Sequence, residues 1–241
     1  MGSNPTPATN KMKLLFEHNY DSETKLQVFE NDFREIVWLV NNQTVFRESK
    51  MYLNHPNLFG KLIDENIFCS SPKILIGGLG LGKTANTTRD LIANSIVDVV
   101  ECSQDVIDFY HANNPEAPNI NIIKEDFFDY LNATTKTYDC IFMQLDFAGC
   151  SSTHREYQLC MKSNERIYTK EFYQKIYSSL TNNSCFIFDG ITEVDDHTIT
   201  ENLDECGFIT EEKRDNYWRE EIIDIERVTW IARKNEHFCS K

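Results

Sequence analysis

The feature that most constrains the fold is an apolar strand that runs into a glycine-rich turn and then into a helix. The strand is Lys73-Ile-Leu-Ile76, the turn Gly77–Gly82 reads Gly-Gly-Leu-Gly-Leu-Gly, and Thr84–Asn94 has a helical pattern. Glycine in such a turn permits tight backbone angles and close approach of the main chain to a bound ligand. The turn therefore predicts a layered α/β fold with a ligand at the carboxyl ends of its strands.

Strands and helices alternate after this turn. Further strands are predicted at Ile96–Val100, Ile120–Ile123, Tyr138–Met143 and Cys185–Phe188, and near Glu211–Tyr217 and Arg227–Ala232. Helices are predicted at Asp105–Asn113, Phe127–Leu131, Thr169–Leu180 and His197–Cys206. Alternation of this kind predicts a Rossmann-like, mostly parallel seven-stranded sheet with helices on both faces.

The N-terminal region has a different period. Apolar residues alternate with polar ones from about Lys25 to Glu48, interrupted by Asn41-Asn-Gln-Thr44, which predicts antiparallel strands and a hairpin. A helical spacing follows over Met51–Ile67. We therefore expect a disordered leader at residues 1–12, a small antiparallel β-hairpin subdomain at 13–58 and the α/β domain at 59–241.

Net charge and the placement of the cysteines limit which binding partners, metal sites and compartments are expected. The net charge of −14 repels phosphate backbones and anionic lipid, so neither nucleic acid nor a membrane is expected as a partner. The eight cysteines form no Cys-x-x-Cys pair or Cys/His cluster, so no metal site is predicted. With no signal peptide and no apolar run of bilayer length, the expectation is a reduced, cytoplasmic protein.

Acidic residues follow the next two strands. Glu101 ends the second strand, about twenty residues beyond the turn, where a carboxylate accepts hydrogen bonds from ribose hydroxyls. Its neighbour Cys102 is assigned to the same cofactor site. After the third strand, Asp126 is positioned to accept from an adenine amino group, and Phe127 to pack against the ring. An alternative for Asp126 is a helix N-cap.

Two other nucleotide-binding motifs compete for this turn. NAD-binding sheets use the same turn and ribose acid, but the turn here is not GxGxxG and the third acid has no standard role with NAD. The GxxxxGK[ST] phosphate loop matches Gly77–Thr84. Against the phosphate loop, Glu101 and Asp126 would repel phosphates, and we find no convincing strand that ends in a magnesium-binding Asp.

The motifs together resemble those of the polyamine aminopropyltransferase (spermidine synthase-like) family within the class I methyltransferase fold. Lys73–Gly82 resembles its first motif, Asp98-Val-Val-Glu101 its ribose-binding strand, and Lys124–Phe128 its adenine segment. Tyr168-Thr-Lys-Glu-Phe-Tyr173 is similar to its LYTKEFY helix start. The resemblance implies S-adenosylmethionine or its decarboxylated form as co-substrate, with Gly77, Gly78, Gly80, Gly82, Glu101, Cys102, Asp126, Phe127 and Gln144 as its binding residues.

Two departures from the family pattern bear on the reaction. The family's first motif is GGGDGG, whose Asp contacts the amino group of the decarboxylated cofactor, and Gly80 stands at that position. Its DSSDP segment corresponds to Met143–Gly149, where Gln144 replaces the first Asp and Asp146 stands near the second. Gln is no general base. Loss of an acid beside the cofactor's tail favours intact S-adenosylmethionine, because like charges in one pocket are costly.

The acceptor side of the site is assigned more loosely. Asp146, Gln144 and Tyr157 are the candidate catalytic residues, and Gln43, Tyr52, His55 and His154 the candidate substrate contacts. The segment between residues 149 and 167 is long and polar for a strand-to-helix connection, as a substrate wall would be. The resemblance also implies a polyamine-type substrate class and a homodimer.

The expected function is transfer of a propyl-type group from S-adenosylmethionine to a nitrogen of an amine or a purine-like heteroaromatic small molecule. The 3-amino-3-carboxypropyl group is favoured over aminopropyl. The alternatives are a small-molecule N-methyltransferase on the same fold, a true spermidine-type aminopropyltransferase, and a nucleoside-binding protein without catalysis.

Overall fold

The computed structural model describes residues 12–19, 25–31, 36–40, 43–48, 58–80, 82–114, 118–143, 165–191, 196–215 and 227–234. The chain divides into two compact units. One comprises residues 1–56 with 148–158, and the other residues 57–147 with 159–241. Each unit carries its own sheet, and each is described by itself.

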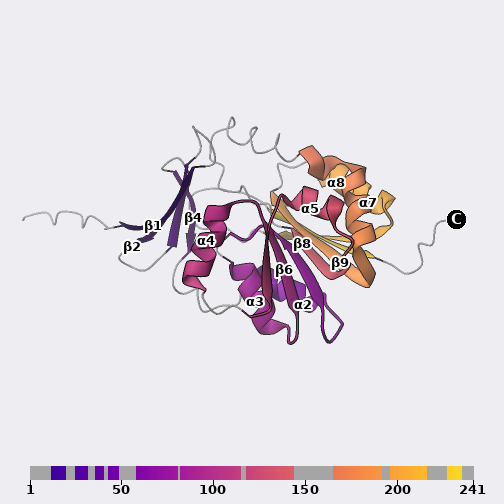
Figure 1. Cartoon of the computed structure of the whole chain (residues 1–241). Coiled ribbons are helices and arrows are strands. Elements are labelled where there is room, and N and C mark those ends of the chain that lie inside the picture. Colours follow the sequence, from indigo (N-terminus) through magenta and orange to yellow (C-terminus); the bar gives the residue numbers. More distant parts are fainter. Residues whose placement is uncertain are drawn as a thin grey trace, which may run out of the picture. The chain divides into compact units, whose positions relative to one another are not determined.

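The first unit contains a four-stranded antiparallel sheet in the order β1-β2-β3-β4 (Figure 1). Its strands are β1 (Met12–Asn19), β2 (Lys25–Asn31), β3 (Ile36–Val40) and β4 (Gln43–Glu48). The predicted antiparallel strands and hairpin are confirmed. The sequence did not predict β1, whose register with β2 shifts between Leu14 and Phe16. Such a bulge interrupts the period of two that identifies a strand in a sequence.

The second unit is built on a seven-stranded sheet in the order β10-β11-β9-β8-β5-β6-β7. Its strands are β5 (Lys73–Gly77), β6 (Ile96–Glu101), β7 (Ile120–Lys124), β8 (Tyr138–Met143), β9 (Leu180–Ile191), β10 (Phe208–Asp215) and β11 (Arg227–Lys234). Strands β5 to β9 pair in parallel, and β11 runs antiparallel to both β9 and β10. The predicted mostly parallel sheet is confirmed.

Helices cover both faces of this sheet (Figure 1). The helical elements are α2 (Leu58–Glu65), α3 (Lys83–Leu91), α4 (Gln104–Asn113), α5 (Phe127–Ala133), the short 3-10 helix η1 (Glu165–Tyr168), α7 (Lys170–Ser179) and α8 (Asp196–Glu205). Helices α5, α7 and α8 contribute to one apolar core with Leu75, Val100 and Ile141 of the sheet. On the other face Phe59 of α2 packs against Phe142 of β8, with ring centroids 5.3 Å apart.

The central strands are apolar on both faces because helices cover both of them. Ile74, Leu75 and Ile76 of β5 are at most 1% exposed, which explains why the sequence there shows an unbroken apolar run. At the far side of the sheet Trp230 of β11 is fully buried and stacks on Phe188 with centroids 5.2 Å apart. Buried rings of this size contribute strongly to the stability of the core. The core thus fixes the strand ends that carry the candidate site.

No helix in the part of the chain that the structure describes is long and apolar enough to cross a bilayer.

Candidate functional site

Parallel pairing brings four strand ends together at the carboxyl edge of the sheet. Gly77 of β5 lies opposite Val100 of β6 and opposite Met143 of β8. Glu101 at the end of β6 lies opposite Lys124 at the end of β7. The glycine turn, Glu101 and the segment that begins after Lys124 are therefore neighbours, as the sequence predicts. Ligands of doubly wound sheets bind at this edge.

The glycine turn is held by backbone hydrogen bonds and by close packing. Gly78 has φ +91 and donates its N–H to the carbonyl of Val100 at 2.9 Å, and the Gly82 N–H donates to the Leu79 carbonyl at 2.8 Å. Gly82 has φ +76, and a Cβ there would lie 2.1 Å from Cε2 of Tyr110. The tight fit and the positive φ make glycine a structural requirement at position 82.

Gly80 differs from the other glycines of the turn. It is exposed with φ +51, and a Cβ added to it would meet no atom within 4 Å. By contrast, a Cβ on Gly77 would lie 2.8 Å from the ring of Phe127. A left-handed φ near +51 is tolerated by Asp and Asn as well as by Gly. Packing therefore does not exclude an acid at position 80, and the charge of this part of the turn is free to vary.

Glu101 joins the glycine turn to the start of helix α4. Its Oε2 accepts the Leu79 N–H at 3.0 Å, and its Oε1 accepts the Ser103 N–H at 2.8 Å. The thiol of Cys102 lies 3.6 Å from Oε1, as a weak donor. An ionised carboxylate has about four acceptor positions. After the two backbone bonds, each oxygen of this partly exposed side chain keeps capacity for one more strong donor, such as a ribose hydroxyl.

Asp126 caps helix α5. Its Oδ1 accepts the backbone N–H groups of Phe128 at 3.0 Å and Asp129 at 3.1 Å, so the helix-cap alternative describes its local role. Its carboxylate also pairs with both terminal nitrogens of Arg166 at 3.0 Å. Arg166 lies forty residues further along the chain, and no local pattern indicates it. Contact of Asp126 with an adenine amino group stays a prediction.

Phe127 is only 4% exposed and packs against Gly77 and Phe128. Its ring therefore belongs to the core beneath the glycine turn, and it accounts for the missing side chain at Gly77. Little of the ring surface remains for a ligand in the structure as described. Its predicted packing against adenine stays a prediction.

Lys83 follows the turn as the first residue of α3. Its ammonium nitrogen is buried, and burial lowers the pKa of Lys83 to about 8. A lysine at this place completes the phosphate-loop motif in the sequence. However, three backbone amides of the turn, those of Gly78, Leu79 and Gly82, already donate within the protein, to acceptors that include the Glu101 carboxylate. A phosphate cradle needs such amides to face the ligand, which argues against a phosphate loop.

Strand order argues against the NAD-binding alternative. Counted from β5, the sheet has the order 3-2-1-4-5-7-6 with its seventh strand reversed. The common NAD-binding sheet is 3-2-1-4-5-6 and parallel. The reversed strand β11 lies between β9 and β10, so this sheet does not have the NAD-binding arrangement.

Several sequence-predicted residues lie outside the described part of the chain. These are the candidate catalytic residues Asp146, Gln144 and Tyr157 and the candidate substrate contacts Tyr52, His55 and His154. Gln43 belongs to β4, but its side chain is not described. The strand that precedes Gln144 ends at Met143, directly opposite Gly77. The roles of all these residues stay predictions.

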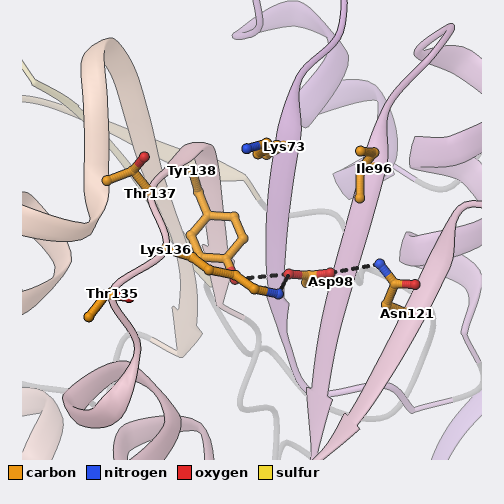
Figure 2. A pocket seen from close by; sticks show the side chains of 8 residues that line it. All are labelled: Lys73, Ile96, Asp98, Asn121, Thr135, Lys136, Thr137 and Tyr138. Carbon is orange, nitrogen blue, oxygen red and sulfur yellow. Dashed lines mark hydrogen bonds and ion pairs between the residues drawn. The ribbon is translucent and has the colours of Figure 1, made fainter.

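A second polar cluster, which the sequence did not predict, lies at the opposite, amino edge of the sheet. It borders a hollow of about 360 Å³ (Figure 2). Asp98 of β6 is its centre, with a side chain only 6% exposed. Figure 2 shows Lys136 and Tyr138 approaching Asp98 from one side and Asn121 from the other. All three donate to its carboxylate at 2.9 Å.

The charged and polar groups of the Asp98 cluster are paired with one another. Burial alone would raise the pKa of Asp98, but hydrogen bonds from Lys136, Asn121 and Tyr138 hold that pKa below its usual range. Burial and a 2.5 Å hydrogen bond to Tyr130 raise the pKa of Tyr138, so its hydroxyl stays protonated. Each of these donors is a side chain of the protein, so the fold alone accounts for burial of this carboxylate without a ligand. We therefore place the candidate functional site at the carboxyl edge.

Comparison with solved structures identifies proteins with a similar fold. Spermidine synthase from Thermotoga maritima superposes with a TM-score of 0.62 at 18% identity, over 94% of this chain and 75% of that one. A probable spermidine synthase from Corynebacterium glutamicum gives 0.65 at 14% identity, over 90% and 79%. A precorrin-6y C5,15-methyltransferase from Geobacter metallireducens gives 0.54 at 12% identity, over 78% and 93%.

Neither a protein-family model nor a curated protein sequence matches this chain. At identities of 12–18% the structural likeness establishes the fold, while the chemistry depends on the residues of the site. The second unit has the Rossmann-like class I methyltransferase fold, and the first unit has a small antiparallel sheet of its own.

Proposed function

We propose that this protein is an S-adenosylmethionine-dependent transferase and a divergent member of the spermidine synthase-like family. It moves a propyl-type group, 3-amino-3-carboxypropyl in preference to aminopropyl, to a nitrogen of an amine or heteroaromatic small molecule. One observation carries the proposal. Glu101 ties the glycine turn to α4 through two backbone amides and still has an acceptor position on each oxygen.

The residues of the carboxyl edge fit such a co-substrate. Two ribose hydroxyls match the two remaining acceptor positions of Glu101, and the exposed Gly80 leaves room for the amino acid tail. Two structural neighbours are spermidine synthases, one of them in complex with the transition-state analogue AdoDATO. These likenesses support a nucleoside sulfonium as the co-substrate.

The preference for the intact co-substrate depends on Gly80. An acid at this position would repel the carboxylate of S-adenosylmethionine and attract the tail amine of the decarboxylated form. A Cβ at position 80 meets open space, so steric packing does not account for the absence of an acid. The neutral turn favours the tail that keeps its carboxylate.

The sulfonium of S-adenosylmethionine supplies an electrophilic carbon. In propyl transfer the acceptor nitrogen forms the new C–N bond while the C–S bond breaks and its electron pair stays on sulfur. The protein has to align the nitrogen opposite the leaving sulfur and accept the released proton. Asp146 is our candidate for the proton acceptor, and Gln144 and Tyr157 for alignment.

Methyl transfer to nitrogen is the second candidate. It is favoured by the likeness to the precorrin methyltransferase and to the N-methyltransferase NodS from Bradyrhizobium japonicum. NodS superposes with a TM-score of 0.51 at 12% identity, over 74% of this chain and 93% of that one. Both reactions use the same co-substrate and differ in which carbon beside sulfur the nucleophile reaches.

The nucleoside by-product separates these reactions. The full chain is incubated with intact or decarboxylated S-adenosylmethionine and a panel of amines and purines, and the products are identified by mass spectrometry. We expect methylthioadenosine from the intact co-substrate with an acceptor carrying the aminocarboxypropyl group. S-adenosylhomocysteine would establish methyl transfer instead. Binding of the co-substrate with neither product would contradict the transferase and leave the nucleoside-binding alternative.

Substitution of Gly80 tests the preference between the two tails. Asp at position 80 should weaken binding of intact S-adenosylmethionine about tenfold while strengthening that of the decarboxylated form, since one new charge faces the tail. Gly80→Asn is the matched control, because Asn has the same shape and tolerates the same φ without the charge. Equal effects of Gly80→Asp and Gly80→Asn on both ligands would show that position 80 does not select the tail.

A further inference from the structure

Arg166 is the most extensively bonded exposed cation near the carboxyl edge among the described residues. Its Nη1 and Nη2 donate to Oδ1 and Oδ2 of Asp126, each at 3.0 Å, and Nη1 also lies 3.4 Å from Oδ1 of Asp129. The guanidinium carbon lies 4.1 Å from the ring centroid of Phe128. Arg166 belongs to η1 and all three partners to the start of α5, so one side chain joins two elements.

The two oxygens of Asp126 are held differently. Oδ1 accepts the backbone N–H groups of Phe128 and Asp129 as the helix cap, as well as Nη1 of Arg166. Oδ2 accepts Nη2 of Arg166 and has no other partner among the described residues. A carboxylate oxygen accommodates about two donors. Oδ1 is therefore filled, while Oδ2 keeps one position for a donor from outside the protein.

We propose that Arg166 is a positioning residue for purine recognition. The helix cap fixes Oδ1 of Asp126, and Arg166 fixes Oδ2, whose remaining acceptor position then receives the exocyclic amino group of the adenine. This inference rests on the proposed function, which supplies the adenosine part of the ligand. It goes beyond that function because it assigns to Arg166 the orientation of the Asp126 oxygen that selects a 6-amino purine.

Charge and geometry both support this role. A bidentate guanidinium–carboxylate pair holds both oxygens in one plane, which a lysine cannot do. The Phe128 ring beneath the guanidinium restricts it further. Because Arg166 and Asp126 have side chains 47% and 39% exposed, the pair contributes little to folding stability. Loss of Arg166 should therefore change recognition of the base more than the stability of the fold.

The experiment compares two nucleosides that differ at the 6-position of the purine. Equilibrium titration of the full chain measures the affinity for methylthioadenosine, which has a 6-amino donor, and for methylthioinosine, which has a 6-oxo acceptor. Wild type, Arg166→Ala, Arg166→Lys and Arg233→Ala are compared. Arg233 is the matched control, since it is a similarly exposed arginine of β11 whose Nη2 lies 3.7 Å from Oε2 of Glu211 on the neighbouring strand β10.

We expect wild type to prefer methylthioadenosine and Arg166→Ala to lose at least fivefold of that preference, with Arg166→Lys between them, since one ammonium cannot bridge both oxygens. Arg233→Ala should bind like wild type. An unchanged preference in Arg166→Ala would overturn the proposal, as would an equal loss of affinity for both nucleosides, which indicates a structural role. If wild type binds neither nucleoside, the proposed function itself fails, and the role of Arg166 falls with it.

Discussion

Strand β6 carries an acid near each of its ends, and the two acids differ in what surrounds them. Asp98, near the amino end, takes hydrogen bonds from three side chains of two other segments and is 6% exposed. Glu101, at the carboxyl end, takes backbone amides of the glycine turn and of the start of α4, and it is partly exposed. Asp98 is almost fully buried and its three donors are side chains of the protein, whereas Glu101 is partly exposed and keeps an acceptor position on each oxygen that a ligand can use.

The largest effect on stability is expected from substitution of Gly82, because the backbone of the glycine turn forms part of the carboxyl edge. Gly82→Ala places a Cβ 2.1 Å from the Tyr110 ring at φ +76, which should cost about 4 kcal/mol through overpacking and strain or prevent folding. The measurement is urea unfolding. Gly80→Ala is the control, with open space around its Cβ and a cost of about 1 kcal/mol from φ alone. Equal stability of the two variants would contradict the packing described for the turn.

Asp98→Asn should have the next largest effect and act on stability alone. An amide in place of the carboxylate leaves the Lys136 ammonium without its counter-ion, and the amide NH2 group faces another hydrogen-bond donor. Together these changes should lower the free energy of unfolding by about 3 kcal/mol near pH 7. Asp108→Asn, an exposed acid on α4, is the control and should change stability by less than about 0.5 kcal/mol.

The same variant has a predictable pH dependence. Because the pKa of Asp98 is lowered in the folded state, its contribution is fully present above the unfolded value of 3.8 and is lost as pH falls through the folded pKa. The stability difference between wild type and Asp98→Asn should therefore be constant from neutral pH down to about pH 4 and shrink below it. A difference that shrinks already between pH 7 and 5 would contradict an ionised, well-bonded Asp98.

Glu101→Gln should reduce ligand binding and cost less stability than Asp98→Asn, because Glu101 is partly exposed and water can accept from the backbone N–H that the amide NH2 group then faces. The amide oxygen accepts one of the two backbone donors, but the charge and one acceptor for the ribose are lost, so binding of S-adenosylmethionine should weaken by about 1–3 kcal/mol. Calorimetric titration measures this, with Glu125→Gln as the control on the same edge of the sheet. Unchanged affinity in Glu101→Gln would remove Glu101 from the proposed site.

The smallest of these effects is the change in stability with pH that is expected from the buried Lys83. Burial lowers its folded pKa to about 8 from 10.5, so between these pH values the unfolded chain binds more protons and the stability rises with pH. Lys83→Met has no such group, and the stability of wild type relative to this variant should increase from pH 8 to pH 10. Thermal unfolding at both pH values measures it, with Lys61→Met on α2 as the exposed control. A relative stability independent of pH would show that the lysine is solvated.

Local pattern predicted the elements on which the carboxyl edge is built. Strand β8 has the predicted bounds of Tyr138–Met143, and the turn and Glu101 lie as neighbours because parallel pairing aligns strand ends. These features depend on residues close in the sequence, or on the sheet rule that connects them. The mostly parallel sheet and the order of the motifs could therefore be predicted from these patterns, while the class I fold followed from the family resemblance of the motifs.

The interactions that sequence reasoning missed join residues far apart. The hydrogen-bond partners of Asp98 lie 23 to 40 positions away in the sequence. Without knowledge of these partners, an acid inside a strand is predicted to lie at the surface. Arg166 and Asp126 are 40 positions apart. Only the folded chain shows which polar side chains meet. The bulge in β1 is a further case, because its pairing with β2 interrupts the alternation.

The most direct test of the contrast between the two edges is amide hydrogen exchange of the full chain with and without S-adenosylmethionine. We predict slower exchange with ligand at residues 78–80, 82 and 101–103, which include the two amides that donate to the Glu101 carboxylate, and unchanged exchange at residues 135–138 beside Asp98. Slower exchange confined to residues 135–138, or no change at the glycine turn under saturating ligand, would contradict the assignment of the binding site to the carboxyl edge.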